Sequence, residues 1–400
     1  MKYEFNQAVI LCGGEGSRLG NITKKTPKPL IKKNGKPFLE HQIEYLKKFG
    51  FTKFLLLCGY KSNDFIKKYE KYKNIDIITE NKKLDTGGAL MNALNFLDDN
   101  FLFYNGDTFA DFNFKYFIDS LKKTNFKNSI AIKYHNLSNR YGKVKINNKS
   151  KLVSKISKNI SSNYIFTGFS LLNKELIRNI KTEKKNFEDL ILEKLIKQKK
   201  LHSFKINKKI NFIDIGIKSD LKKGSEVLMQ SLNRKVVFFD RDGTINKDIN
   251  YLYKYSDLIW NKSAYKAIHY LNSKNILVFI ITNQSGVGRG FYSEKDVLKI
   301  HSQMNKCLLD NNAYIDDFFY AMYYKYSKKF NFNNSDFKKR KPNIGMVLEA
   351  RKKWKFDIKN SIIIGDNIVD ELLAKNLKIR FYKVNYKTNL LNIVKKEFKD

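Results

Sequence analysis

The chain has 400 residues, 42% of them hydrophobic, so it exceeds the size at which one hydrophobic core keeps growing and two domains are expected. Its formal charge of +38 raises nucleic acid or an anionic membrane as a partner, yet the 77 Lys and Arg residues are spread over nearly every segment. We therefore expect no nucleic-acid partner and no membrane partner, and the charge suits anionic small substrates equally well.

The cysteines and the first apolar stretch indicate the cellular compartment in which the protein is expected. Cys12, Cys58 and Cys307 are far apart and form no CxxC pair, which argues against a disulfide framework or a thiolate metal site. The stretch from Ala8 to Cys12 is too short for the hydrophobic region of a signal peptide or for a membrane span. We expect a cytoplasmic protein whose oligomeric state stays open, a homo-oligomer included.

Short apolar runs followed by helical patterns recur along the first half of the chain. Ala8 to Leu11 is such a run, and a helix is expected around Phe38 to Phe49. This alternation predicts right-handed βαβ units and a parallel sheet. Ser219 to Arg234 indicates one amphipathic helix and a connector, so we expect the domains to be residues 1–232 and 233–400.

The glycine-rich stretch LCGGEGSRLG follows the first expected strand. Gly13, Gly14 and Gly16 let backbone amides approach a polyphosphate, and Arg18 adds a fork of donors for phosphate oxygens. Lys28 stands between two prolines in TPKPL, which limit the backbone freedom around its charge. The glycines alone are typical of a plain strand-to-helix turn, but together with Arg18 and Lys28 they predict a phosphate site.

Two aspartates of the same half are expected at strand ends. Asp107 ends the apolar run FLFYNGD, and Asp214 ends NFID. A single aspartate in such a place often caps a turn. Each is also a hard oxygen ligand of the kind that Mg²⁺ takes in phosphate chemistry.

The motifs GGEGSRLG, TPKPLIKKNGKPFLE, CGYKS, DTGGAL, YNGDT and FIDIG together resemble the sugar-nucleotidyltransferase superfamily, over about residues 6–225. The resemblance is greatest to D-glycero-D-manno-heptose 1-phosphate guanylyltransferases, with the mannose-1-phosphate enzymes next. It implies a Rossmann-like α/β domain with a mixed sheet, in which a sugar 1-phosphate attacks the α-phosphorus of a nucleoside triphosphate, here GTP, and releases pyrophosphate. By position it assigns the triphosphate to Arg18 and Lys28, the base to Gly87 and Gly88, Mg²⁺ to Asp107 and Asp214, and the sugar phosphate to Lys158.

The chain departs from this family pattern at two positions. Asp85 stands where a glycine is usual, and Ser157 stands where an acidic residue usually precedes the lysine. These departures concern the contacts to the base and to the sugar more than the reaction itself.

A second set of strands is expected at Val236 to Asp240, Ile276 to Asn283 and Ser361 to Asp366. Each ends in a polar residue, and in open α/β sheets ligands lie beyond the carboxyl ends of the strands. Asp240 and Asp242 in FFDRDGTIN offer a nucleophile near Mg²⁺ and a separate acid for the leaving oxygen. Two aspartates before a glycine are also found in plain turns, but the apolar strand in front favours a site.

Later segments can complete this second site. Thr282 and Asn283 can hydrogen-bond a phosphoryl group, Lys341 can neutralise it, and Asp366 can hold the metal. DRDGTIN, TNQSGVGRGF and RKPNIGM resemble the haloacid-dehalogenase phosphatase superfamily over about residues 235–385, in the branch of heptose 1,7-bisphosphate 7-phosphatases and histidinol-phosphate phosphatases.

This second resemblance implies a Rossmannoid domain with a parallel sheet and a phosphatase that works through an aspartyl-phosphate. It assigns the nucleophile to Asp240, proton transfer to Asp242, phosphate binding to Arg340 and Lys341, and Mg²⁺ to Asp240, the Asp242 carbonyl, Asp366 and, through water, Asp370. The Cys/His loop that commonly precedes RKP in this branch is absent, so no zinc is expected.

Both resemblances point to consecutive steps in making a GDP-heptose for a surface glycan. The alternative in the same class is a mannose-1-phosphate or other hexose-1-phosphate nucleotidyltransferase joined to a histidinol-phosphate-like or other sugar phosphatase. A different class is a nucleic-acid-binding or end-processing protein, because DRDGT also resembles DNA 3′-phosphatases. Those enzymes usually carry a Walker-type kinase, and this sequence lacks its motif.

Overall fold

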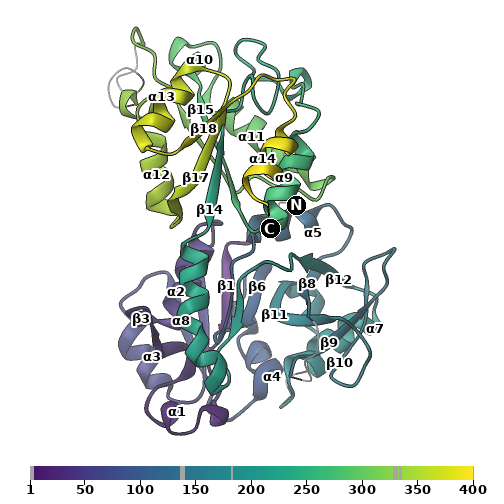
Figure 1. Cartoon of the computed structure of the whole chain (residues 1–400). Helices are drawn as coiled ribbons and strands as arrows, with labels where there is room; N and C mark the ends of the chain where they lie inside the picture. The colour runs from purple at the N-terminus through teal and green to yellow at the C-terminus, as the bar shows by residue number, and fades with distance from the viewer. Residues whose placement is uncertain (1–3, 136–139, 182, 328–331, 333–335, 400) are drawn as a thin grey trace. The chain divides into compact units, whose positions relative to one another are not determined.

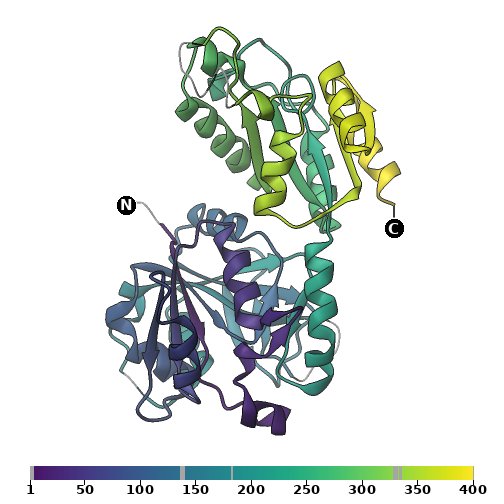
Figure 2. The same ribbon diagram turned by 90° about the vertical axis from the view of Figure 1, so that its left-hand side faces the viewer.

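The computed structural model describes residues 4–135, 140–181, 183–327, 332 and 336–399. It divides into two compact units, Met1–Met229 and Gln230–Asp400, each with strands through its middle and helices around them (Figure 1 and Figure 2). The boundary between the units falls inside helix α8, Lys218–Leu232. No helix among the described residues combines the length and apolar character needed to cross a membrane.

The first unit is built on a mixed sheet, nine strands within the described residues. Its path runs β10-β9-β11-β6-β1-β4-β5, with β8 beside β11 and β12 beside β8. β1 is parallel to β4 and β6, whereas β11 is antiparallel to β6 and β8. The strands are β1 Gln7–Leu11, β4 Lys53–Cys58, β5 Ile75–Thr79, β6 Asn100–Asn105, β8 Asn128–Tyr134, β9 Lys143–Ile146, β10 Val153–Ser157, β11 Tyr164–Asn173 and β12 Leu201–Ile206.

Short strand pairs and helices surround this sheet. The pairs are β2 Lys32–Lys33 with β3 Lys36–Pro37, and β7 Thr108–Ala110 with β13 Phe212–Asp214. Besides α8, the helices of this unit are α1 Asn21–Lys25, α2 Phe38–Lys47, α3 Ser62–Tyr69, α4 Asp85–Asn92, α5 Phe114–Lys122, α6 Lys174–Ile177 and α7 Glu193–Lys197.

Strand β1 shows why its sequence is continuously apolar. Ala8 and Ile10 belong to one buried cluster, and Val9 between them belongs to another. Successive side chains of a strand point to opposite faces, so both faces of the sheet are covered and neither can be polar.

The second unit is built on a five-stranded parallel sheet in the order β16-β15-β14-β17-β18. The expected fold class, a mixed sheet followed by a parallel one, is confirmed. The strands are β14 Lys235–Phe239, β15 Leu277–Asn283, β16 Asp317–Ala321, β17 Asp357–Gly365 and β18 Arg380–Lys383. The helices are α9 Ala264–Ser273, α10 Ser285–Arg289, α11 Glu294–Leu309, α12 Gly345–Lys353, α13 Ile368–Leu377 and α14 Leu390–Glu397.

Strand β14 is also buried on both faces. Val237 and Phe239 lie in a cluster with residues of α9, α11 and α14, while Phe238 packs against Phe279 and Phe356 on the other side. Because all five strands are parallel, their carboxyl ends meet at one edge of the sheet. That edge receives the residues of the second candidate site.

Candidate active sites

The loop after β14 delivers Asp240 into the second unit's site. Asp240 is 8% exposed, and its backbone N–H donates to the carbonyl of Ile364 at 2.9 Å. Gly243 follows in the left-handed region, with φ +85°, and a Cβ there would lie 2.2 Å from Oδ2 of Asp366. The glycine therefore allows both the turn and the approach of a carboxylate from β17.

Three carboxylates converge at this edge of the sheet. Asp240, Asp366 and Asp370 each offer an oxygen within 4.8 Å of the others. Burial raises the pKa of Asp240, Lys341 lowers it and Asp370 raises it again, and the balance lies above the ordinary value. Burial and the neighbouring Asp370 also raise the pKa of Asp366. The group thus carries more negative charge than its surroundings neutralise, and its oxygens are ligands that suit Mg²⁺, so the residues fit that ion.

Lys341 is the cation within this group. Its ammonium lies 2.6 Å from Oδ1 of Asp240 and 2.6 Å from Oδ1 of Asp370, and it donates to the carbonyl of Ile281 at 2.9 Å. The Lys341 backbone N–H donates to Oδ1 of Asn283 at 2.9 Å, and the Asn283 amide donates back to the Lys341 carbonyl at 3.3 Å. Strand β15 therefore fixes the segment that carries the lysine.

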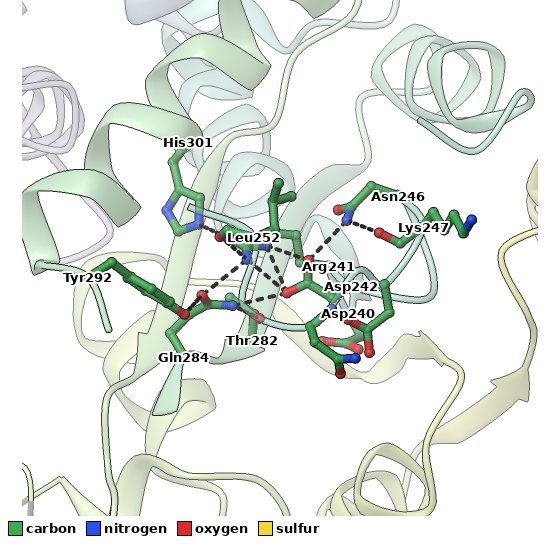
Figure 3. A network of polar contacts seen from close by, with 12 residues as sticks. Asp240, Arg241, Asp242, Asn246, Lys247, Leu252, Thr282, Gln284, Tyr292 and His301 are labelled. Carbon is green, nitrogen blue, oxygen red and sulfur yellow. Dashed lines mark hydrogen bonds and ion pairs between the residues drawn. The ribbon is translucent and has the colours of Figure 1, made fainter. Parts of the chain in front are cut away.

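The side chain of Asp242 lies in a separate hydrogen-bond network (Figure 3). Arg241 donates to it from Nε and Nη2, Asn246 donates to Oδ1 at 2.9 Å, and Gln284 donates to Oδ2 at 3.1 Å. Burial raises the pKa of Asp242, but Arg241 and the two amides lower it, and the balance lies below the ordinary value. Without substrate, Asp242 is therefore held as a carboxylate, the form that accepts a proton.

Asp240, Asp242, Lys341 and Asp366 line a common cavity of about 340 Å³. Arg340, Thr282 and Asn283 line it too, although the Thr282 hydroxyl already accepts from Gln284 at 2.8 Å. Burial and then the Arg289 guanidinium lower the pKa of Arg340. The positive charge of Arg289 therefore acts on Arg340 at this cavity, an arrangement that suits an anionic ligand.

Arg241 and Gln284 are part of this site although the sequence analysis gave neither a role. Both lie inside the quoted motifs, and their position next to Asp242 and Asn283 was the available signal. The segment expected to lack a zinc loop, residues 323–342, lies partly outside the described residues.

The first unit's candidate site begins at the loop after β1. Gly16 has φ +68°, and a Cβ there would lie 2.7 Å from Cε of Lys28, so the glycine lets the lysine side chain pass. Gly13 packs against the backbone of Gly59, whereas a Cβ on Gly14 would meet nothing within 4 Å. Arg18, in the 3₁₀ turn Ser17–Leu19, is exposed.

The pairing of β7 with β13 brings Asp107 and Asp214 together. Asp214 pairs with Thr108, and the N–H of Ile215 donates to the carbonyl of Asp107 at 2.9 Å. The Lys28 ammonium lies 3.1 Å from Oδ2 of Asp107. Burial and repulsion from Asp107 raise the pKa of Asp214 to about 6. Two adjacent carboxylates that repel one another fit a divalent cation.

Arg140 is a further residue of this site that the sequence analysis did not single out. Its guanidinium lies 2.7 Å from Oδ1 of Asp214, donates to the Asp214 carbonyl at 3.1 Å and contacts the Asp220 carboxylate. No local pattern marks it, because its partners lie 74 and 80 residues further along the chain.

The structure does not gather every predicted residue of this site around the two aspartates. The N–H groups of Gly87 and Gly88 donate to the carbonyl of Lys185, at 3.0 and 3.3 Å. Their contact with a nucleotide base therefore stays a prediction. Lys158 is exposed in the turn after β10, on a different element from the glycine loop.

The two units together define an enzyme of phosphate chemistry with two separate acidic sites. Residues 7–231 match the family described as nucleotidyl transferase, and residues 235–387 match the family described as polynucleotide kinase 3 phosphatase. A presumed glucose-1-phosphate thymidylyltransferase from Bacillus anthracis shares the first unit's fold, with a TM-score of 0.50 and 20% identity over 56% of this chain and 95% of that one.

Two relatives from Campylobacter jejuni cover the two halves. The chain is 36% identical over 220 residues to a D-glycero-alpha-D-manno-heptose 1-phosphate guanylyltransferase, covering 54% of this chain and 96% of that protein. It is 35% identical over 148 residues to a D-glycero-alpha-D-manno-heptose-1,7-bisphosphate 7-phosphatase, covering 37% of this chain and 80% of that protein. The chain belongs to the nucleotidyl transferase family and carries, in addition, a phosphatase domain of the haloacid-dehalogenase type.

Proposed function

We propose that this chain catalyses two consecutive steps of sugar-nucleotide synthesis. The second unit removes the 7-phosphate of D-glycero-D-manno-heptose 1,7-bisphosphate, and the first unit transfers GMP from GTP to the resulting heptose 1-phosphate. The observation that carries this proposal is the pairing itself: the two halves resemble two enzymes of one organism, and the product of one reaction is the substrate of the other.

In the phosphatase reaction, a carboxylate oxygen of Asp240 attacks phosphorus and the bond to the sugar oxygen breaks. Asp242, which takes up a proton from water as the substrate's phosphate binds beside it, donates that proton to the sugar oxygen. It then takes a proton from the water that attacks phosphorus of the aspartyl-phosphate, and inorganic phosphate leaves. Lys341, Thr282 and Asn283 hold the transferred group, and Arg340 offers its guanidinium to the substrate's phosphates.

In the transferase reaction, an oxygen of the sugar 1-phosphate attacks the α-phosphorus of the nucleotide and the bond to the β-phosphate breaks, so pyrophosphate leaves. Arg18 and Lys28 bind the triphosphate at the glycine loop, Lys158 binds the sugar phosphate, and Gly87 and Gly88 contact the base.

Mg²⁺, where bound, neutralises charge that develops on the phosphate oxygens in both reactions. Asp107 and Asp214 would hold it in the first unit. In the second unit Asp240, Asp366 and the carbonyl of Asp242 would hold it, with Asp370 behind them.

The test is mass spectrometry of the products formed when the heptose bisphosphate is supplied with Mg²⁺ and all four nucleoside triphosphates. We expect inorganic phosphate, pyrophosphate and GDP-heptose. A GDP-hexose formed instead from mannose 1-phosphate, or a different base, would move the assignment to another sugar nucleotide. Release of neither phosphate nor pyrophosphate contradicts the proposal.

A second candidate concerns the phosphatase unit alone. Its matching family is described by a nucleic-acid 3′-phosphatase, and the chain has a formal charge of +38. Incubation with a DNA oligonucleotide that ends in a 3′-phosphate distinguishes this candidate from the heptose-bisphosphate phosphatase. We expect no dephosphorylation of the oligonucleotide, and faster turnover of DNA than of the heptose bisphosphate would favour the second candidate.

A further inference from the structure

Both oxygens of the Asp242 carboxylate accept hydrogen bonds from side chains. Oδ2 accepts from Nη2 of Arg241 at 2.8 Å and from Nε2 of Gln284 at 3.1 Å, and Oδ1 accepts from Asn246 at 2.9 Å. We call Arg241, Asn246, Gln284 and, behind them, Tyr292 the Asp242 clamp. Figure 3 shows Arg241, Asn246 and Gln284 converging on the Asp242 carboxylate, with Tyr292 in contact with Gln284.

The orientation of Gln284 is fixed at both ends of its amide. Its Oε1 accepts from Arg241 at 3.1 Å and from the Tyr292 hydroxyl at 2.9 Å, so its Nε2 must face Asp242 and Thr282. Gln284 lines the cavity, but a substrate could use its polar atoms only by breaking one of these bonds.

Arg241 is held too firmly to reach the cavity. Only 1% of its side chain is exposed, and besides Asp242 and Gln284 it contacts the Leu252 carbonyl at 3.3 Å and Nε2 of His301 at 3.4 Å. A guanidinium bound on so many sides cannot swing toward a phosphate, so its charge acts on Asp242.

Tyr292 occupies space that a glycine leaves open. A Cβ on Gly286 would lie 2.2 Å from Cε1 of Tyr292, and the Tyr253 ring stacks on the Tyr292 ring at 5.5 Å between centroids and 9° between planes. Both neighbours confine the ring, and its hydroxyl donates to Gln284.

We propose that the Asp242 clamp is a set of positioning residues that holds the Asp242 carboxyl group in the orientation that faces the oxygen leaving phosphorus. This inference rests on the proposed aspartyl-phosphate mechanism. Attack by Asp240 does not pass through the clamp, because the Asp240 carboxylate contacts Lys341 and lies with Asp366 and Asp370. Loosening the clamp lets the Asp242 carboxyl group turn away from the leaving oxygen, so it weakens proton donation and leaves nucleophilic attack in place.

The dependence of the rate on the leaving group tests the proposal. Aryl phosphates with increasingly basic phenolate leaving groups are compared, from p-nitrophenyl phosphate, which needs little protonation, to phenyl phosphate, which needs more. The value of kcat/KM reports formation of the aspartyl-phosphate. In Gln284→Leu and Tyr292→Phe we expect about a 10- to 100-fold loss with phenyl phosphate, within the span that general acid catalysis supplies. With p-nitrophenyl phosphate we expect a much smaller loss.

Tyr270→Phe is the matched control. It removes a tyrosine hydroxyl that donates to the Phe398 carbonyl at 2.7 Å in the same unit, away from the clamp, and should leave the leaving-group series unchanged. Arg241→Lys keeps the positive charge but loses the paired guanidinium donors, and should resemble Gln284→Leu if the variant folds. If Arg241→Lys does not fold, Tyr292→Phe, which removes one oxygen atom, keeps the test valid. Equal losses with every aryl phosphate, or no loss, overturn the proposal.

Asp242→Asn separates failure of the clamp from failure of the proposed mechanism. If Asp242→Asn shows the leaving-group dependence and the clamp variants behave like the unmodified protein, only the clamp proposal is wrong. If Asp242→Asn shows none, Asp242 is not the acid, and the clamp proposal falls with the mechanism.

Discussion

Replacing Lys341 with methionine tests how the acidic site of the phosphatase unit is held together. Methionine keeps an unbranched side chain but removes the ammonium, which lies 2.6 Å from oxygens of both Asp240 and Asp370. Only 2% of the lysine side chain is exposed, so it is a buried partner of these carboxylates. Removing one partner of a buried ion pair costs about 3–5 kcal/mol. We expect the unit's free energy of unfolding to fall by that amount at neutral pH without divalent cations.

Tryptophan fluorescence measures the unfolding of the second unit by itself. The chain's two tryptophans, Trp260 and Trp354, both lie in the second unit, so indole fluorescence during urea unfolding follows that unit. Lys339→Met is the matched control, because the exposed Lys339 side chain pairs with exposed Glu349 at 3.1 Å and lies 3.9 Å from the buried Asp336 carboxylate, at the limit of an ion pair. Such a pair is worth at most about 1 kcal/mol. If Lys341→Met unfolds at the same urea concentration as Lys339→Met, the ammonium is not what balances the carboxylates.

Three further predictions concern other parts of the two sites and the first unit. Gly243→Ala would place a Cβ 2.2 Å from Asp366, and we expect phosphatase kcat to fall by about 100-fold with nucleotidyl transfer unchanged; equal activity of the variant contradicts this. Burial and then Lys151 lower the pKa of His202 from 6.5 to about 4, so stability from its neutral form is present above pH 6.5 and lost as the pH falls toward 4. As the pH is lowered, the free energy of unfolding of His202→Phe should therefore fall by up to about 3 kcal/mol less than that of the unmodified chain. Circular dichroism measures the acid transition, and an unchanged transition would show that His202 does not set it. Mg²⁺ should stabilise the metal-free phosphatase unit by about 2.7 kcal/mol at 100 times its Kd, and an equal response of Asp366→Asn would place the ion elsewhere.

The strands and their ends could be predicted from the sequence because burial on both faces makes a parallel strand continuously apolar. Val236 to Phe239 is such a run, and all four residues are buried. Since the carboxyl ends of parallel strands share an edge, Asp240, Asn283 and Asp366 could be expected near one another. Strand β17, however, begins at Asp357 and not at Ser361, because its exposed polar residues Lys359 and Asn360 interrupt the apolar pattern.

The contacts that orient the sites could not be predicted in the same way. Arg241 is a charged side chain directly after Asp240, and nothing local indicates that it turns into the interior to bind Asp242, Gln284 and His301. Gly87 was assigned to a base from its motif, but the carbonyl that its amide meets lies almost a hundred residues away, on Lys185. Such contacts depend on how distant loops pack, and no periodic pattern in the sequence predicts that packing.

The central claim is that two independent sites act in sequence on one sugar. A phosphorus NMR time course with the heptose bisphosphate, GTP and Mg²⁺ tests it most directly, using the unmodified chain and Asp240→Asn. We predict that the unmodified chain forms the 1-phosphate and then GDP-heptose, while Asp240→Asn leaves the bisphosphate intact yet still converts added heptose 1-phosphate. Loss of both reactions in Asp240→Asn, or release of phosphate by it, would contradict the account.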